Sequence, residues 1–270
     1  MVESLDKVDV LQLKKLKWLL TDVDDTLTWE GKLPPETLQA LSKLEAVGVN
    51  VIAVTGACAG WCDQMAKLWP LHGVIGENGA FWMRKDQQGF TTHYIRNAEM
   101  MKREQQALNH AIESLLLDYP DVSLSLDQPF RFCDVAVNIA QDRLSLPSNV
   151  TKNILEKIKH LDIEGQRVHA TQSSIHINAW VGNHSKQQTS EAYLTQFAPD
   201  ENRDLTEVSY VGDSLNDEGM FAWLPLTFGV NNIRALLPKL IHHPQFITTE
   251  NGGYGFAELA EKIVKAKQTH

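Results

Sequence analysis

Short apolar runs alternate with amphipathic helical patterns over the first eighty residues of the chain. Apolar runs at residues 18–22, 49–54 and 74–75 predict strands, and continuous apolar runs are typical of parallel strands that are buried on both faces. The segments that begin at Pro34 and at Ala59 have the apolar spacing of helices. This part of the chain therefore predicts alternating strands and helices, the pattern of an α/β fold.

The pattern changes between about Phe81 and Trp180, where apolar and polar residues alternate. The alternating sets are Val122, Leu124 and Leu126, then Val135, Val137 and Ile139, and finally Ile175 with Ile177. Such alternation predicts an antiparallel sheet with one covered face. Helical spacing within residues 108–115 and 150–161 predicts two amphipathic helices that cover that face.

After Lys186 the strand-and-helix pattern returns, with strands predicted at 208–211, 226–230 and 246–247 and a last helix from Phe256. We therefore predict an α/β core, a doubly wound and mainly parallel Rossmann-like sheet, with an inserted α+β cap domain. The predicted core is discontinuous and comprises residues 1–84 and 181–270, and the predicted cap comprises residues 85–180. A chain of 270 residues is long enough for one such core with an insertion.

Composition limits the classes of partner. The net charge is −9 and the sequence has no basic stripe, so neither a nucleic acid nor an anionic membrane is an expected partner. No apolar run reaches the ~18 residues of a membrane span, and the first residues lack the pattern of a signal peptide. The odd count of three cysteines favours a reducing compartment, so we expect a cytoplasmic protein. The sequence gives no indication of an oligomeric state.

Polar residues that could act in catalysis or ligand binding gather at the predicted carboxyl ends of strands, where open α/β sheets bind ligands. They are Asp22 and Asp24 after the first strand, Thr55 and Gly56 after the second, Lys186 at the start of a helix, and Asp213 and Asp217 after a later strand. Like-charged carboxylates ~4 Å apart repel by about 4 kcal/mol at an effective dielectric of ~20, so a cation or a proton is expected to offset them. Acid pairs with a hydroxyl and an ammonium group suit Mg²⁺ and a phosphoryl group.

These residues resemble, in order, the four motifs of the haloacid dehalogenase-like phosphohydrolase superfamily. The matching segments are Asp22-x-Asp24-x-Thr26, Thr55-Gly56, Lys186, and Gly212-Asp213-x-x-Asn216-Asp217. The insertion resembles the larger α/β cap of Cof-type, sucrose-phosphatase-like and mannosyl-3-phosphoglycerate-phosphatase-like members. The resemblance implies a Mg²⁺-dependent phosphatase that forms an aspartyl-phosphate. Its partner would be a small-molecule phosphate ester, such as a sugar phosphate.

The resemblance also implies a role for each motif residue. Asp22 would be the nucleophile, and Asp24 would protonate the leaving oxygen and later deprotonate water. The Asp22 carboxylate, the Asp24 backbone carbonyl and Asp213 would hold Mg²⁺. Asp217 would be a further ligand or a group that holds a water or Lys186. The remaining motif residues, which would contact the phosphoryl group, are Thr55, Gly56, Lys186 and Asn216.

One position departs from the resembled pattern. Relatives with this kind of cap often have Arg directly after Thr-Gly, and this chain has Ala57. An anion contact is therefore expected to be missing or supplied elsewhere. We interpret the nearby Trp61 and Trp69 as core or interdomain packing rather than as substrate platforms.

Strand alternation also suggests residues that recognise the leaving group. If Val137 and Ile177 face the cap helices, then Asn138, His176 and Asn178 face the other way. In the resembled families that face closes over the core site. The alternative is that these three are ordinary exposed strand positions.

Two other functions share part of the pattern. A sugar phosphomutase of the same superfamily would use the same motifs but keep water from the aspartyl-phosphate. A response-regulator receiver, a signalling switch, also has an acid cluster, a Thr and a Lys on a doubly wound sheet. The position of Asp24 two residues after Asp22, and the large insertion between Thr55 and Lys186, favour the enzyme over the receiver.

Overall fold

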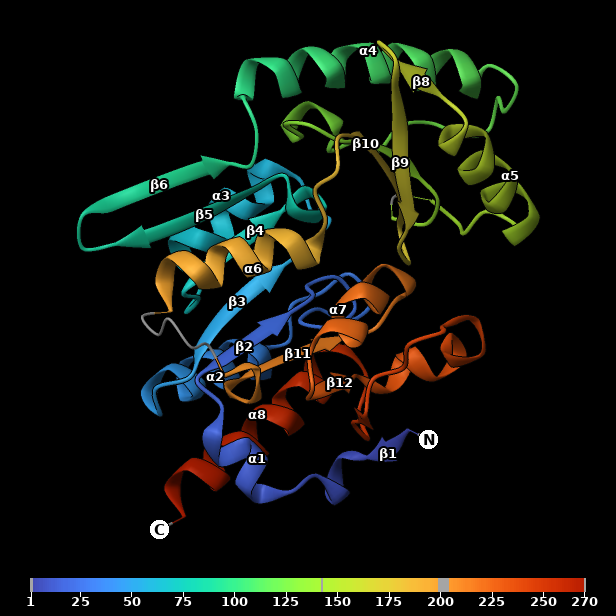
Figure 1. Cartoon of the computed structure of the whole chain (residues 1–270). Helices are drawn as coiled ribbons and strands as arrows, with labels where there is room; N and C mark the ends of the chain where they lie inside the picture. Colours follow the sequence, from blue (N-terminus) through green and yellow to red (C-terminus); the bar gives the residue numbers. More distant parts are fainter. Residues whose placement is uncertain (1, 142, 199–203, 270) are drawn as a thin grey trace.

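A nine-stranded sheet forms the larger part of the computed structural model, which describes residues 2–141, 143–198 and 204–269 (Figure 1). Its strands lie in the order β1 (Glu3–Ser4), β13 (Phe246–Ile247), β12 (Thr227–Gly229), β11 (Val208–Gly212), β2 (Trp18–Thr21), β3 (Asn50–Val54), β4 (Gly73–Gly76), β5 (Phe81–Asp86) and β6 (Gly89–Tyr94). Pairing is parallel from β1 through β4, and β5 and β6 add an antiparallel hairpin.

Helices cover both faces of this sheet. One face packs against α1 (Val10–Lys15), α2 (Pro35–Ala46), α3 (Ala59–Leu68) and α8 (Gly252–Gln268), and the other against α6 (Lys186–Phe197) and α7 (Glu218–Trp223). Successive residues of β2 illustrate the two faces, because Leu19 belongs to one hydrophobic cluster and Leu20 to the other. Burial on both faces explains why these strands are continuous apolar runs.

A smaller antiparallel sheet with two helices lies beyond the carboxyl ends of β2 and β3, and we call this part the cap (Figure 1). Its strands lie in the order β7 (Val135–Asn138), β10 (His176–Val181), β9 (Gln166–Gln172) and β8 (Asp162–Ile163). The covering helices are α4 (Ala98–Leu116) and α5 (Ser148–Lys159). Val137 and Ile177 pack with Ile112 of α4 and Ile154 of α5, so the alternate strand positions face away from these helices.

The predicted α/β class, with a mainly parallel doubly wound sheet and an α+β insertion, is confirmed by this architecture. One local prediction is wrong. Leu124 makes only an isolated bridge to Val137, and Leu126 is exposed. The Ser125 N–H still donates to the Ala136 carbonyl of β7 at 2.8 Å, and the chain then turns away and forms a short 3-10 helix, η3 (Gln128–Phe130).

The alternating pattern that begins near Phe81 belongs first to the large sheet. Strand β6 lies at the edge of that sheet and alternates between exposed and half-buried positions. A one-sided edge strand has the same period-two pattern as a cap strand, so the sequence pattern does not distinguish them. The predicted boundary between residues 84 and 85 falls inside β5. The strand pairing supports a domain division that places the whole hairpin with the core.

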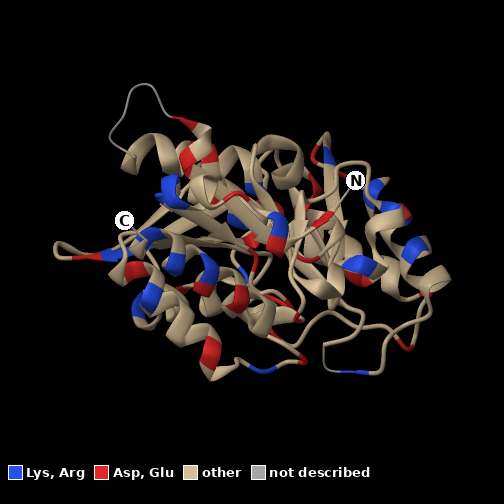
Figure 2. Ribbon diagram, turned by 90° about the horizontal axis from the view of Figure 1, so that it is seen from below, with Lys and Arg blue, Asp and Glu red and all other residues tan. Residues whose placement is uncertain are grey.

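Charged residues are spread over the described part of the molecule. Lys and Arg positions are interspersed with Asp and Glu positions along the helices (Figure 2). Among the described residues, no helix has both the length and the apolar character that a bilayer span requires.

The two segments that join the cap to the core pack against each other. Arg96, in the first segment, donates from Nη2 to the Val181 carbonyl at 2.7 Å and to Glu104 Oε2 at 2.7 Å. In the second segment the His184 ring is buried and stacks on Trp180 with centroids 5.6 Å apart. Burial, followed by the charge of Arg96, lowers the pKa of His184 to about 3.

A neutral buried histidine makes the fold sensitive to acid. His184 takes up a proton near pH 6.5 in the unfolded chain, but only near pH 3 in the folded protein. Its contribution to the free energy of unfolding is therefore complete above pH 6.5 and is lost as the pH falls toward 3. Between pH 7 and pH 5 this linkage costs about 2 kcal/mol. We expect His184→Phe, which keeps a ring beside Trp180, to reduce the loss of unfolding free energy between these pH values. Urea unfolding at pH 7 and pH 5 measures this loss in both proteins, and the same loss in the variant as in the unchanged protein would contradict the prediction.

Candidate active site

Two carboxylates share one buried ammonium group at the carboxyl end of β2. Asp22 directly follows the strand, and its backbone N–H donates to the Val211 carbonyl of β11 at 2.9 Å. Lys186 is the first residue of α6, whose N-terminus is capped by the Ser185 side chain. The Lys186 Nζ donates to Asp22 Oδ1 at 2.6 Å and to Asp217 Oδ1 at 2.7 Å. Buried charges of this kind are stable only when they are paired.

Asp217 uses both carboxylate oxygens to hold protein groups. Its Oδ1 also accepts from the Tyr210 hydroxyl at 2.5 Å, and its Oδ2 accepts from the backbone N–H groups of Asp213 and Ser214, each at 3.0 Å. These contacts fix the turn after β11 and orient Lys186. Whether Asp217 also binds a metal directly stays a prediction, because its carboxylate oxygens lie in one cluster with those of Asp22 and Asp213.

Asp213 is oriented by two side chains from other loops. Thr26 Oγ1 donates to its Oδ1 at 3.1 Å, and Asn232 Nδ2 donates to its Oδ2 at 3.0 Å. Asn232 also donates to the Asp25 carbonyl at 3.0 Å, so it links this acid to the loop after β2. Sequence reasoning missed the role of Asn232, because nothing in its short 3-10 segment signals a contact with the motifs.

The acid cluster places three carboxyl groups close together beside the Lys186 ammonium group. Carboxylate oxygens of Asp22, Asp213 and Asp217 lie within 4.8 Å of one another and are buried. Burial raises the pKa of Asp22 to about 8, although Lys186 lowers it. Burial, and then the charges of Asp22 and Asp217, raise the pKa of Asp213 well above its usual range. A divalent cation with a preference for oxygen ligands fits this cluster and would offset the charge of its carboxylate groups.

Most of the predicted site residues converge on one small cavity of about 10 Å³. Its lining comprises Asp22, Asp24, Gly56, Ser173, Ser174, His176, Asn178, Ser214 and Asn216. Thr55 is buried next to Gly56, and its hydroxyl accepts from the Ala57 N–H at 3.0 Å, which leaves the hydroxyl proton available to donate. The predicted residues from the core and from β10 therefore meet in space.

Asn138 lies opposite His176 in the strand register but is outside the lining of this cavity. Its Oδ1 accepts from the Gln141 N–H at 3.1 Å. Asn138 therefore supports the turn that carries Gln141. Gln141 itself lines a larger cavity nearby.

Asp24 has the electrostatic environment of a carboxyl group whose pKa lies close to neutral pH. Burial, and then the neighbouring charge of Asp25, raise the pKa of Asp24 to about 6, although Arg131 lowers it. A carboxyl group with a pKa near the working pH can both give and take a proton.

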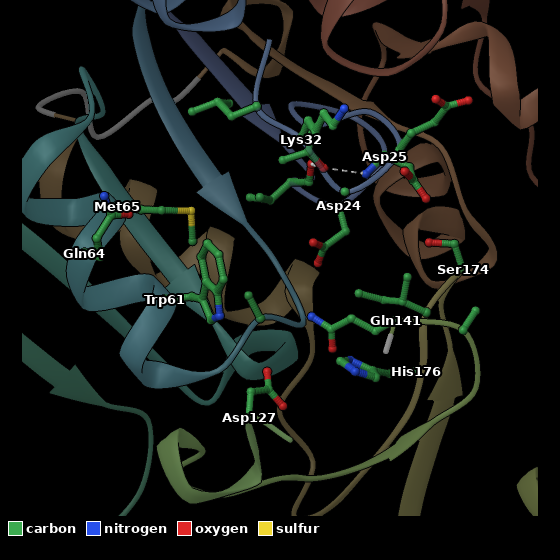
Figure 3. Close-up of a pocket in the computed structure, with 18 of the residues that line it drawn as sticks. Asp24, Asp25, Lys32, Trp61, Gln64, Met65, Asp127, Gln141, Ser174 and His176 are labelled. Atoms are coloured by element: carbon green, nitrogen blue, oxygen red, sulfur yellow. Dashed lines mark hydrogen bonds between the residues drawn. The ribbon is translucent and has the colours of Figure 1, made fainter. Parts of the chain in front are cut away.

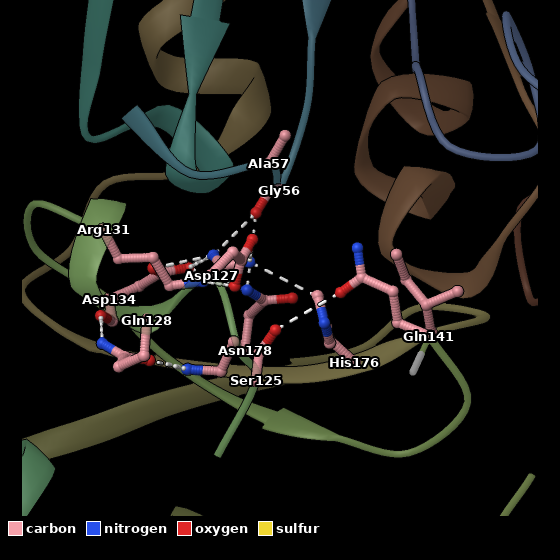
Figure 4. Close-up of polar contacts among 12 residues, drawn as sticks. Gly56, Ala57, Ser125, Asp127, Gln128, Arg131, Asp134, Gln141, His176 and Asn178 are labelled. Carbon is pink, nitrogen blue, oxygen red and sulfur yellow. Dashed lines mark hydrogen bonds and ion pairs between the residues drawn. The ribbon is translucent and has the colours of Figure 1, made fainter. Parts of the chain in front are cut away.

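A buried guanidinium from the cap lies beside Gly56 (Figure 4). Arg131 Nη1 donates to the Gly56 carbonyl at 3.0 Å, and the guanidinium forms ion pairs with Asp127 and Asp134, each at 3.0 Å. The structure thus places an arginine next to the segment that contains Gly56 and Ala57. Its donors are taken by these partners, so it connects the cap to the core instead of presenting an open anion site.

The contact with Arg131 defines the tautomer of His176. Arg131 Nη2 lies 3.4 Å from His176 Nδ1, and a guanidinium can only donate, so Nδ1 is the acceptor and Nε2 carries the proton. Burial, and then the charge of Arg131, lower the pKa of His176 to about 4. The ring is therefore neutral, and its buried Nε2 has no hydrogen-bond partner among the described residues.

Glu77 is a second contact between core and cap. It is buried in the short 3-10 helix η2 (Glu77–Gly79), at a φ of 44°. Its Oε1 accepts from the N–H groups of Ala59 and Phe132 at 3.0 and 2.7 Å. Its Oε2 accepts from those of Cys133 and Asp134 at 2.7 and 3.0 Å. One carboxylate thus binds the start of α3 and the cap segment that leads into β7.

A larger cavity of about 760 Å³ opens next to the small one, between α3, the loop after β2 and the cap (Figure 3). Asp24, Ser174 and His176 line both cavities. Trp61 lines the larger cavity and is 55% exposed, so it does not pack in the core, and its packing between core and cap stays a prediction. Trp69 is half-buried against the core cluster, as expected.

Comparison with known proteins gives similarity over nearly the whole chain. The model of a family described as haloacid dehalogenase-like hydrolase matches residues 19–258. A phosphoglycolate phosphatase of Staphylothermus marinus is 26% identical over 254 residues, which cover 90% of this chain and 95% of that protein.

Two solved structures illustrate the likeness of fold. Thermoplasma acidophilum 0175 superposes with a TM-score of 0.67 at 14% identity, over 92% of this chain and 98% of that one. The sucrose-phosphatase of Synechocystis, solved with sucrose and phosphate, gives a TM-score of 0.61 at 15% identity, over 93% of this chain and 98% of that one.

The Glu77 contact predicts a large effect of a small substitution. In Glu77→Gln the amide nitrogen cannot accept a hydrogen bond, so two buried N–H groups lose their partner. We expect a loss of about 3 kcal/mol of unfolding free energy, measured by urea denaturation. Glu113→Gln, at an exposed position of α4, is the control and should change little. Equal stability of the two variants would show that the contact is unimportant.

Proposed function

Because the chain belongs to the haloacid dehalogenase-like hydrolases, we propose that it is a phosphatase that hydrolyses a phosphate monoester through an aspartyl-phosphate on Asp22. The observation that carries the proposal is the convergence of Asp22, Asp24 and Asn216 on one small cavity, with Lys186 bonded to Asp22. The phosphatase names of the relative from Staphylothermus and of the Synechocystis neighbour agree with this chemistry.

The first half-reaction transfers the phosphoryl group to the protein. The Asp22 carboxylate attacks phosphorus, a new oxygen–phosphorus bond forms, and the bond to the leaving oxygen breaks. Asp24, whose pKa of about 6 keeps part of it protonated, gives its proton to the leaving oxygen. Lys186, the Thr55 hydroxyl and Asn216 stabilise the charge of the phosphoryl oxygens.

The second half-reaction frees the protein. The Asp24 carboxylate takes a proton from a water molecule, the resulting hydroxide attacks phosphorus, and the bond to Asp22 breaks. Inorganic phosphate leaves, and both acids return to their starting states. Release of phosphate into solution separates this activity from that of a phosphomutase, which would transfer the group to a second sugar oxygen.

The acid cluster fits a bound Mg²⁺. The Asp22 carboxylate, the Asp24 backbone carbonyl and Asp213 would hold it, and Asp217 would keep Lys186 and the turn after β11 in place. When bound, the ion supplies positive charge that offsets the carboxylates and the phosphoryl oxygens. The substrate would be a sugar phosphate or a similar small phosphorylated metabolite.

Removal of the nucleophile tests the reaction. We expect Asp22→Asn to lower phosphate release from small esters by on the order of a thousandfold or more, because an amide cannot form the aspartyl-phosphate. The control is Asp118→Asn, which removes an exposed cap carboxylate and should leave the rate unchanged. Full activity of the Asp22→Asn variant would refute the assignment.

Metal dependence distinguishes the roles of the two acids after β11. Chelation should abolish phosphate release, and added Mg²⁺ should restore it. We expect Asp213→Asn to raise the Mg²⁺ concentration for half-maximal activity by about tenfold or more. Asp217→Asn should lower the rate with a smaller change in that concentration, since its oxygens hold Lys186 and backbone groups. If Asp217→Asn shifted the half-maximal Mg²⁺ concentration more than Asp213→Asn did, Asp217 would be the direct ligand.

A further inference from the structure

The larger cavity lies where the leaving group of the proposed reaction must go. Asp24, the proposed acid for the leaving oxygen, lines both the small cavity and the larger one, together with Ser174 and His176. A phosphoryl group at Asp22 therefore has its ester oxygen directed past Asp24 into the larger space. That space, about 760 Å³ in volume, exceeds what a two-carbon leaving group requires.

One wall of this cavity is aromatic and apolar. Trp61 lies near the start of α3 and is 55% exposed, although many large apolar side chains of the chain are fully buried. Met65, one turn further along α3, lines the same wall. Figure 3 shows Trp61 on one side and Asp24, Gln141 and His176 on the other. An exposed indole that faces a cavity offers a flat surface for stacking.

The opposite wall presents hydrogen-bond donors. The Nε2–H of His176 is buried and has no partner among the described residues, a costly state unless a ligand accepts from it. Ser125 Oγ donates to Gln141 Oε1 at 3.3 Å, which leaves the Gln141 amide N–H groups to donate. The donor wall thus suits a leaving group that carries hydroxyl, ether or carbonyl oxygens.

The charged residues around the cavity are mainly acidic. They are Asp24, Asp25, Glu30 and Asp127, against Lys32 and Arg131. Arg131 is already paired with the carboxyl groups of Asp127 and Asp134, so its positive charge is not available to a ligand. The other charged lining residues are Lys32 against Asp25 and Glu30, and the proposed acid Asp24 adds negative charge only when it is ionised. A second anionic group on the substrate would be repelled here.

We propose that this cavity is the leaving-group site and that Trp61 and His176 select phosphate esters with a flat-faced, uncharged or cationic leaving group that lacks a second anion. The proposal rests on the proposed phosphatase function and narrows its substrate class. It argues against phosphoglycolate, the substrate in the name of the Staphylothermus relative, whose leaving group carries a carboxylate. An uncharged sugar or an aromatic alcohol can stack on Trp61 and accept hydrogen bonds from the donor wall.

Two matched aryl esters test the charge selection. One is 4-(carboxymethyl)phenyl phosphate and the other is its amide, and the methylene group keeps the acidity of the two phenols similar. We expect kcat/KM to favour the amide by about fivefold or more at low salt, and the ratio to fall in 0.5 M NaCl. Glu30→Gln should narrow the ratio, and the exposed control Glu113→Gln should not.

Substitution of Trp61 tests the stacking wall. We expect Trp61→Ala to lower kcat/KM for the amide ester by on the order of tenfold, mainly through KM, and Trp61→Phe to restore most of the loss. Hydrolysis of acetyl phosphate, whose leaving group is small, should fall much less than hydrolysis of the amide ester in both Trp61 variants. Leu68→Ala, at a 71% exposed position of the same helix, is the control, and circular dichroism checks the fold of each variant.

His176 is tested in the same assay. His176→Phe removes the Nε2–H and keeps a ring, so kcat/KM for the amide ester should fall while acetyl phosphate hydrolysis persists. Equal use of the carboxylate ester, a preference for phosphoglycolate, or no effect of Trp61→Ala would overturn the inference while phosphate release stands. Absence of phosphate release from every substrate tested, acetyl phosphate included, would overturn the proposed function itself.

Discussion

The ammonium group of Lys186 joins three segments that are distant in the sequence. It bonds Asp22, 164 residues earlier in the chain, and Asp217, 31 residues later. Carboxylates at this depth would repel each other without a buried cation. The end of β2, the turn after β11 and the start of α6 must therefore meet at one point. Because Lys186 begins the first core helix after the cap, the chain must also return from the insertion to that point.

The cap is positioned by buried charges of a similar kind. Glu77 offers its carboxylate to backbone N–H groups of both α3 and residues 132–134. Arg131, in the same cap segment, reaches back to the Gly56 carbonyl and is neutralised by Asp127 and Asp134. These contacts place β10 over the acid cluster, so that His176 and Asn178 close the small cavity.

Under the proposed function, the site divides into a region for chemistry and a region for recognition of the leaving group. The small cavity holds the acids of the proposed reaction, and its members are held in place by one another and by the backbone. The larger cavity is lined by side chains such as Trp61 and Gln141, which belong to α3 and to a cap turn. Recognition residues on separate elements can differ between relatives without disturbing the buried charges, which is how one catalytic core serves different leaving groups.

The sequence by itself determined the parallel core, because strands buried on both faces must be apolar throughout. It also determined that Asp22, Gly56 and Asp213 meet, since parallel strands end at the same edge. Period-two alternation placed His176 and Asn178 on the face of β10 away from the cap helices. Only the tertiary structure decided that Arg131 lies beside Gly56, that Asn232 holds Asp213, and that Trp61 faces a cavity. Those contacts join residues with no periodic relation, and they depend on how the cap is seated on the core.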